Sequence, residues 1–208
     1  MNVYLDHAAT SPMPAEVIEA YTSALGVVGN PSSIHTQGQT AKRMLEEARE
    51  AVAAAVGAEP IEVTFTSGGT EAINLALKGL WWARTSPVIE PVEIHGAVST
   101  GSTTGQRILS TRAEHHATID ALEWLERHEG AVIEWIPVDS VGRIHLAALE
   151  AALGPDVALV TTLWANNEVG TVQPVAEIVA LATAHGVPVH ADAVSALGQL
   201  PIDFAASG

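Results

Sequence analysis

The sequence predicts an α/β protein with a mainly parallel sheet and helices on both faces. Two observations lead to this prediction. From about residue 62 to residue 192, short apolar runs of strand length alternate with runs of helical length. This alternation is typical of βαβ units, and apolar strands of this kind suit a sheet that is covered on both sides. The hydrophobic content of 48% is sufficient for a sizeable core.

Two helices are expected before the alternation begins. Residues 14–25 form a short helix with Pro14 in its first turn. The stretch GNPSSIH at 29–35 is turn chemistry. Residues 37–56 form a long amphipathic helix that ends at Gly57, a plausible C-cap. We expect its buried face to carry Met44, Ala48, Ala51 and Ala55.

The later elements follow in regular order. Strands are expected at 62–67, 107–111, 131–138, 157–164 and 187–192. Helices are expected at 70–84, 117–128, 146–153 and 174–186. The segment 85–106 is rich in Gly, Ser, Thr and Pro, which predicts a surface excursion and not a linker between domains.

Charge and composition exclude several classes of function. The 24 acidic and 9 basic residues give a net charge of −15, which argues against nucleic-acid and anionic-membrane partners. No apolar stretch reaches the length of a spanning helix, and the first residues do not resemble a signal peptide. Cysteine is absent, so these residues supply neither a disulfide nor a thiolate. We expect a cytoplasmic protein.

The first candidate site follows the strand expected at 62–67. In TSGGTEAIN (66–74), two glycines lead directly into a helix. Glycine lets the backbone approach an anion closely, and a helix N-terminus offers free N–H groups. We call residues 66–70 the phosphate-binding loop. An ordinary strand-to-helix turn with a Thr cap explains these residues equally well. Dinucleotide and ATP loops fit poorly, because their glycine patterns are absent.

The second candidate site is RAEHHATID (112–120), which contains His115 and His116 at the expected start of a helix. Adjacent side chains should point in different directions, so we do not expect both rings to serve one site. His116 suits a surface position, whereas His115 could stack on a flat ligand. A zinc site fits poorly, because the His-x-x-x-His spacing and cysteine ligands are missing.

Two further strand ends carry polar residues. WANNEVGTVQP (164–174) places Asn166, Asn167 and Glu168 after an apolar strand, although Asn is also common in ordinary turns. The stretch VPVHAD (187–192) ends in Asp192. A buried carboxylate without a partner is costly, so Asp192 is expected to have a cationic partner. In a parallel sheet, ligands bind beyond the carboxyl ends of the strands, where these residues would meet.

Together these motifs resemble the cysteine desulfurase family, within the class V group of fold-type I pyridoxal phosphate (PLP) enzymes. The resemblance follows the family's order over nearly the whole chain and corresponds to its N-terminal half. The matching stretches are YLDHAATSP (4–12), GNPSSIHTQG (29–38), EVTFTSGGTEAINLALKG (62–79), AEHHATIDALEWLE (113–126), WANNEVGTVQP (164–174) and HADAVSALGQLPID (190–203).

The resemblance implies roles for five residues around PLP. Gly69 and Thr70 would bind the phosphate. His115 would stack on the pyridine ring and transfer protons on the substrate side. Asn167 would hydrogen-bond the phenolic oxygen. Asp192 would pair with the protonated pyridine nitrogen, which makes the ring an electron sink.

Two positions are assigned less directly by the resemblance. Asn30, in the GNPSS loop, would lie near the substrate. Ser195 stands where the family usually places a glutamine that contacts the phenolic oxygen, so this contact is expected to be lost or bridged by water. The resemblance also implies that residues 1–15 associate with the small domain and that residues 16–208 are part of the PLP-binding large domain.

The complete enzyme implied by the resemblance converts L-cysteine to L-alanine and an enzyme persulfide, for iron–sulfur cluster assembly or thiolation. It is a homodimer that hands sulfur to an acceptor protein. The family's Schiff-base lysine follows the aspartate in a Gly-His-Lys stretch that these 208 residues do not contain, and only Lys42 and Lys78 are present. The chain alone is therefore expected to be inactive. Alternatives are a selenocysteine lyase, a small-substrate aminotransferase, or a non-catalytic fragment or binding module.

Overall fold

The computed structural model describes residues 3–85 and 106–208, which form two compact units. The first unit contains residues 3–65 and 202–206, and the second contains 66–85, 106–201 and 207–208. Nearly all of the surface excursion expected at 85–106 lies outside the described residues. No helix in the described ranges is long and apolar enough to cross a membrane.

The second unit is built on a four-stranded sheet. Its strands are β1 (Arg107–Ser110), β2 (Val132–Trp135), β3 (Val157–Leu163) and β4 (Val189–Asp192). They lie in the order β2-β1-β3-β4, and all neighbouring pairs are parallel. Every residue of the inner strand β3 is buried, which explains its uninterrupted apolar and threonine sequence. The predicted α/β class is confirmed.

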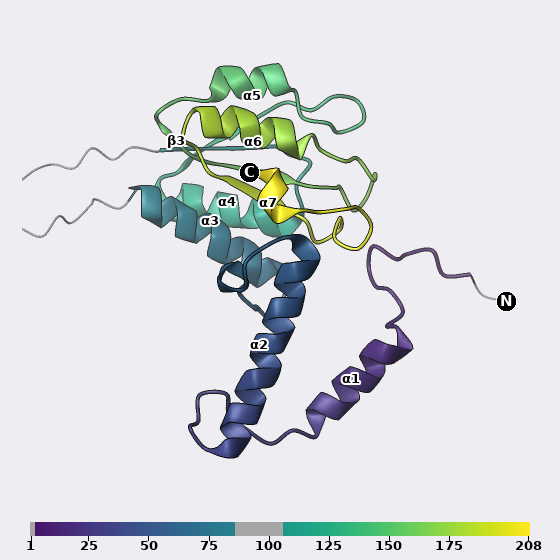
Figure 1. Cartoon of the computed structure of the whole chain (residues 1–208). Coiled ribbons are helices and arrows are strands. Elements are labelled where there is room, and N and C mark those ends of the chain that lie inside the picture. The colour runs from purple at the N-terminus through teal and green to yellow at the C-terminus, as the bar shows by residue number, and fades with distance from the viewer. Residues whose placement is uncertain (1–2, 86–105) are drawn as a thin grey trace, which may run out of the picture. The chain divides into compact units, whose positions relative to one another are not determined.

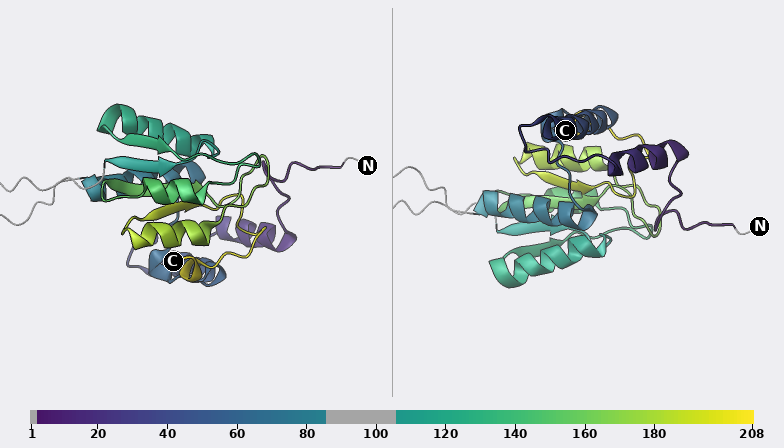
Figure 2. Two further views of the ribbon diagram at one scale, coloured as in Figure 1. Left: turned by 90° about the horizontal axis from the view of Figure 1, so that it is seen from above. Right: turned by 90° about the horizontal axis from the view of Figure 1, so that it is seen from below.

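Helices cover both faces of this sheet (Figure 1). On one face, α3 (Gly69–Thr85) and α4 (His116–Glu129) pack on Ile108 and Leu159. On the other face, α5 (Leu146–Ala152) and α6 (Val175–Ala184) pack on Leu109 and Val160. Successive strand residues point to opposite faces, so each strand contributes to both cores. Figure 2 shows the strands between these helix layers from two further directions.

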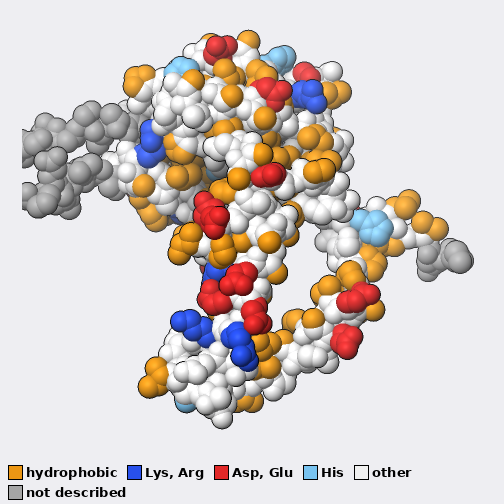
Figure 3. Space-filling model, in the orientation of Figure 1, with side chains coloured by type: hydrophobic (Ala, Val, Ile, Leu, Met, Phe, Trp, Pro, Cys, Tyr) orange, Lys and Arg blue, Asp and Glu red, His pale blue; other side chains and the backbone are white. Residues whose placement is uncertain are grey.

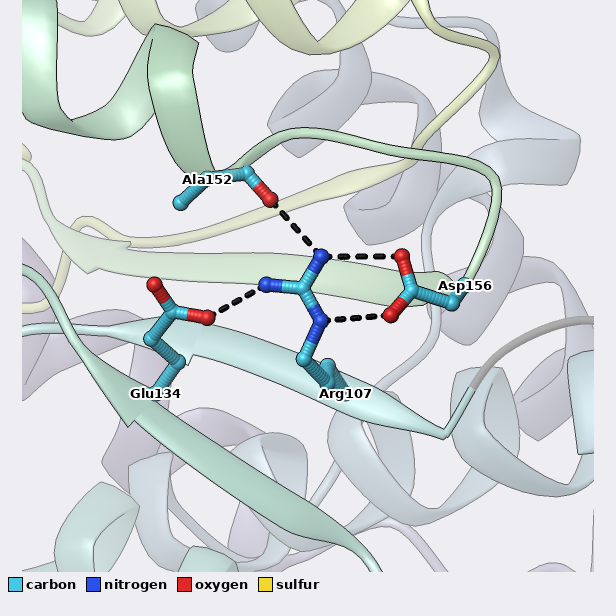
Figure 4. Close-up of polar contacts among 4 residues, drawn as sticks. All are labelled: Arg107, Glu134, Ala152 and Asp156. Atoms are coloured by element: carbon cyan, nitrogen blue, oxygen red, sulfur yellow. Dashed lines mark hydrogen bonds and ion pairs between the residues drawn. The ribbon is translucent and has the colours of Figure 1, made fainter.

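Arg107 joins three segments at the edge of the sheet where β1 begins (Figure 4). Its guanidinium donates to Asp156 through Nε at 2.6 Å and Nη2 at 2.8 Å. Nη2 also donates to the carbonyl of Ala152 at 2.9 Å, and Nη1 pairs with Glu134. The network therefore ties β1 to β2, to the end of α5 and to the turn before β3, on the opposite edge from the candidate site.

The first unit consists of helices. It contains α1 (Ala15–Leu25), α2 (Thr36–Val56), the 3-10 helix η1 (Pro60–Glu62) and most of α7 (Phe204–Ser207). α2 ends at Gly57, as expected, because φ there is +70° and a side chain would be strained. α1 has no buried residue, and Figure 3 shows hydrophobic side chains on its surface.

Two sequence-based predictions for the first part of the chain are wrong. Residues 62–67 do not form a strand: η1 ends at Glu62, and residues 63–66 have no regular structure. A strand requires a hydrogen-bonded neighbour, and no described segment pairs with these residues. The expected buried face of α2 is also wrong, because Met44, Ala48, Ala51 and Ala55 are all exposed. Its buried side chain is Ala53, beside the partly buried Arg49.

Candidate functional site

The candidate site lies at the carboxyl ends of the parallel strands. Leu163, the last residue of β3, pairs with Asp192, the last residue of β4. β1 is the other neighbour of β3 and ends at Ser110, just before the segment that contains His115. Strand order and direction thus bring three of the expected strand ends to one edge of the sheet. This is the edge at which ligands bind in open α/β sheets.

Asp192 is buried without a cationic partner. It is 6% exposed, and its Oδ1 accepts a hydrogen bond from the Val194 N–H at 2.9 Å. No Lys, Arg or His nitrogen in the described ranges lies within 4 Å of its carboxylate. A buried carboxylate in this state is costly unless a cation binds to it. A positively charged group that binds to Asp192 would offset this cost.

Residues 66–70, the loop expected to bind a phosphate, lie next to the turn that follows Asp192. Gly69 is the first residue of α3, so its N–H and that of Thr70 have no partner within the helix. A Cβ atom on Gly69 would lie 3.1 Å from Cγ2 of Val194, in the turn that follows Asp192. Glu71 accepts hydrogen bonds from the Ser67 N–H at 2.7 Å and its hydroxyl at 2.5 Å, and these bonds lower the pKa of Glu71. Bonds between Ser67 and Glu71 thus hold the loop to the first turn of α3, and Gly69 borders the turn after Asp192.

A pocket of about 530 Å³ opens beside the start of α4. It is lined mainly by polar and charged side chains. They come from the segment before α4, its first turns and the loop after β3: Arg112, Ala113, Glu114, His115, His116, Ile119, Asp120, Asn166, Asn167 and Glu168. The candidates His115 and Asn167 therefore share one cavity.

His115 is the N-cap of α4. Its Nδ1 accepts a hydrogen bond from the Ala117 N–H at 3.2 Å, so the ring proton of a neutral imidazole resides on Nε2. The expectation that the two histidines diverge is wrong, because the rings of His115 and His116 lie 3.9 Å apart with a tilt of 41°. Both line the same pocket, although His116 is exposed, as expected. The two rings therefore contact each other at the start of α4.

The two asparagines after β3 have different environments. Asn166 is a structural residue: its Oδ1 accepts from the N–H groups of Glu168 and Val169 at 2.8 and 2.9 Å. Its Nδ2 donates to the carbonyl of Ala113 at 3.0 Å, which joins this loop to the His115 segment. Asn167 lines the pocket, and its side chain makes no hydrogen bond to other described residues. Its amide is therefore available to a ligand.

Two titratable residues at this edge were missed by sequence reasoning. Glu114 lines the pocket, and burial together with the charge of Asp192 raises its pKa to about 8. His190, on β4, lies 2.9 Å from Thr161 Oγ1 through Nδ1, and burial lowers its pKa. The strand period of two was an available signal for His190, since it places this residue on the same face as Asp192. Nothing local in the sequence indicated that Glu114 is partly buried, with its Oε2 shielded from solvent.

The remaining candidates, Ser195 and Asn30, do not line the pocket. Ser195 follows Val194 in the turn after β4 and is partly buried. Asn30 belongs to the other unit, where its Oδ1 accepts from the Ser32 N–H at 2.9 Å and holds the turn before α2. The structure thus brings His115 and Asn167 into one pocket and places Gly69 against the turn after Asp192, whereas Asp192 and Gly69 do not line that pocket. Asn30 has a local role in its own unit.

Known proteins resemble this chain over nearly its whole length. It is 49% identical over 207 residues to the IscS-like cysteine desulfurase of Mycobacterium tuberculosis. This match covers 99% of the chain and 49% of that protein. It is 44% identical over 202 residues to the putative cysteine desulfurase IscS 1 of Bacillus subtilis, covering 97% of the chain and 48% of that protein. The chain spans about half the length of these relatives.

Solved structures have the same fold. A NifS-like protein matches 98% of the chain with a TM-score of 0.86 and 33% identity, over 52% of its own length. A structure of SspA in complex with cysteine matches 98% of the chain with a TM-score of 0.84 and 30% identity, over 54% of its own length. The aminotransferase class V family model matches residues 3–102 and 94–208. The chain belongs to the aminotransferase class V family.

Proposed function

We propose that this chain provides most of the cofactor pocket of a PLP-dependent cysteine desulfurase. The observation that carries the proposal is Asp192, a buried carboxylate at a strand end with no cation beside it in the described part of the chain. The protonated pyridine nitrogen of PLP supplies such a cation. The cofactor fits the family to which the chain belongs, and the relatives named above are called cysteine desulfurases.

The residues around Asp192 suit the other parts of the cofactor. We assign the phosphate to the N–H groups of Gly69 and Thr70 and to the Thr70 hydroxyl, at the start of α3. A side chain at Gly69 would crowd Val194 at this point. We assign the face of the ring to His115 and the phenolic oxygen to the free amide of Asn167, both of which line the pocket.

When bound, PLP provides an electron sink for the carbanion formed at the substrate. The chain's own part is to keep the pyridine nitrogen protonated through Asp192 and to orient the ring. Since Nδ1 of His115 is occupied by the helix cap, Nε2 is the atom through which His115 would exchange a proton. Ser195 is assigned to the neighbourhood of the phenolic oxygen, directly or through water.

The substrate proposed for the complete enzyme is L-cysteine, with L-alanine and an enzyme persulfide as products. The SspA structure that resembles this chain was solved with cysteine bound. Asn30 is proposed to lie near the substrate, residues 1–15 to associate with a small domain, and residues 16–208 to belong to the large domain. A homodimer, a sulfur-acceptor protein and a cytoplasmic location are part of the same proposal. The relatives' names favour desulfurase over selenocysteine lyase or aminotransferase activity.

The proposal is tested by comparing PLP with pyridoxal, which lacks the phosphate, in equilibrium dialysis against the 208-residue chain. We expect PLP to bind at least about tenfold more tightly, since the phosphate-binding loop recognises only PLP. Equal affinity for the two, or no binding of either, contradicts the proposed pocket. Alanine and sulfide release from L-cysteine is measured in parallel. We expect no release above that of free PLP, because these 208 residues contain neither the family's Gly-His-Lys lysine nor a cysteine.

A further inference from the structure

Only one of the two oxygen atoms of the Glu114 carboxyl group accepts a hydrogen bond at normal distance. The Thr111 hydroxyl donates to Oε1 at 2.7 Å. Oε2 is shielded from solvent and has no donor at hydrogen-bonding distance among the described residues. The backbone N–H of Leu163 acts on the carboxyl group only as a minor influence that lowers its pKa. Glu114 lies between the end of β1 and the start of α4 and lines the same pocket as its neighbour His115. A buried carboxylate oxygen without a donor is costly, whereas a protonated carboxyl avoids most of this cost.

The charged groups around Glu114 do not favour its ionised form. Asp192 acts on it as a like charge and, after burial, is the second cause that raises the pKa of Glu114 to about 8. The titratable residues that line the pocket with it are Arg112, His115, His116, Asp120 and Glu168. Neither the Arg112 guanidinium nor a ring nitrogen of His115 or His116 forms an ion pair with Glu114.

Two of the neighbouring groups are engaged elsewhere or uncharged. The Arg112 guanidinium lies over the Trp135 ring, 4.4 Å from its centroid. His190, whose pKa burial lowers, is neutral at pH 7 and brings no positive charge to the pair of carboxyl groups. At this edge of the sheet, the two carboxyl groups thus interact with each other while neither forms an ion pair with a cation among the described residues. Like charges that interact in this way push the two ionisations apart.

We propose that Glu114 is a positioning residue that stays protonated in the folded protein, so that the pair Glu114 and Asp192 carries one negative charge instead of two. This inference rests on the proposed PLP pocket for its purpose: one negative charge matches the one positive charge of a pyridinium. The neutral Glu114 side chain also fixes the segment that bears His115, through the bond from Thr111. An ionised Glu114 would add a second charge that the pyridinium cannot neutralise.

The first test is the pH dependence of urea unfolding of the 208-residue chain, followed by tryptophan fluorescence. All five tryptophans, Trp81, Trp82, Trp124, Trp135 and Trp164, belong to the second unit. A carboxyl whose pKa is raised on folding stabilises the fold at low pH and loses this contribution as the pH rises from about 4.5 to about 8. Glu114→Gln, which mimics the neutral acid, removes this dependence.

The expected result is a ratio that grows with pH. The folding equilibrium constant of Glu114→Gln relative to wild type should rise by up to about tenfold per pH unit between pH 5 and 8, and then level off. The matched control is Glu168→Gln, a pocket-lining but exposed residue, which should give no such rise. The histidines titrate in all three proteins and cancel in the ratio. A constant ratio for Glu114→Gln overturns the proposal.

The second test begins with the wild-type chain. Infrared spectra of the wild-type chain should contain a protonated-carboxyl carbonyl band at pH 7 that disappears with a midpoint near pH 8. Thr111→Val removes a donor that favours the ionised form, so it should move the midpoint to higher pH. Asp192→Asn removes the like charge and should move it lower. Absence of the band at pH 7, or no shift in either variant, contradicts a neutral Glu114.

These readouts are independent of cofactor binding. If the band and the stability ratio behave as expected but PLP does not bind, Glu114 is neutral and the proposed function is wrong. If PLP binds but Glu114 is ionised at pH 7, the pocket stands and this inference is wrong.

Discussion

Gly69 and Val194 are in such close contact that a Cβ atom on Gly69 would lie 3.1 Å from Cγ2 of Val194. Val194 in turn donates its backbone N–H to Asp192 at 2.9 Å. The loop that we assign to the PLP phosphate and the carboxylate that we assign to the pyridine nitrogen are thus linked through one residue. A change at the loop is therefore expected to affect cofactor binding more than folding.

We expect Gly69→Ala to weaken PLP binding by about tenfold or more, about 1.4 kcal/mol. The new methyl group would enter the loop against Val194. Val194 is 69% exposed and can move aside, so the free energy of unfolding should change little. Equilibrium dialysis and urea unfolding measure the two effects. Val194→Ala in the same chain removes the obstructing atoms and should restore part of the affinity, and wild-type affinity in Gly69→Ala alone contradicts the assignment.

We expect Asp192→Asn to separate binding from stability. The amide keeps the bond from Val194 but removes a buried charge that has no cation beside it among the described residues. Unfolding free energy without PLP should stay the same or rise. PLP affinity should fall by about 1.5–3 kcal/mol, the strength of a hydrogen bond to a charged group. Glu126→Gln, an exposed change on α4 outside the pocket, should leave both quantities unchanged. A destabilised Asp192→Asn chain that retains its PLP affinity would show that Asp192 is structural.

His190 should make the protein sensitive to acid. Burial lowers its pKa, so folded His190 binds its proton less readily than in the unfolded chain. Stability from this residue is present above the unfolded value of about 6.5 and is lost as the pH falls below it, by up to about 1.4 kcal/mol per pH unit. His190→Gln can still contact Thr161 and should remove this loss. Urea unfolding between pH 5 and 7.5 measures the difference; parallel curves for the two chains contradict the prediction.

Arg107 should be more important for stability than any exposed ion pair. Lysine cannot reproduce the two parallel bonds to Asp156 together with the bond to the Ala152 carbonyl. We expect Arg107→Lys to lower the free energy of unfolding by about 1–2 kcal/mol. Arg127→Lys is the matched control, since its pair with Glu123 is exposed at 3.5 Å and should contribute less than about 0.5 kcal/mol. Equal effects of the two substitutions would contradict a special role for Arg107.

The sequence predicted nearly every regular element of the second unit because these elements are marked locally. The strands around Ile108 and Leu159 are short apolar runs, and the helices between them have caps and helical periodicity. Parallel pairing and cover on both faces follow from the alternation itself. The family resemblance rests on equally local motifs.

The failed predictions depend on neighbours that are distant in the sequence. Residues 62–67 have a strand-like composition but no pairing partner among the described residues. The exposed face of α2 has the spacing of a buried face, and only its packing partners distinguish the two. The divergence expected for His115 and His116 was wrong: His115 caps α4, and its ring lies 3.9 Å from that of His116.

The sequence by itself determined the α/β class, the family and the candidate site residues at each strand end. Those conclusions depend on residue type, spacing and order along the chain. Only the tertiary structure decided that Asp192 is buried without a cation, that Gly69 contacts Val194, and that the carboxyl groups of Glu114 and Asp192 interact with each other. Burial and electrostatic coupling depend on atoms that the fold brings together from distant segments, and therefore the charge of a site is a property of the folded chain.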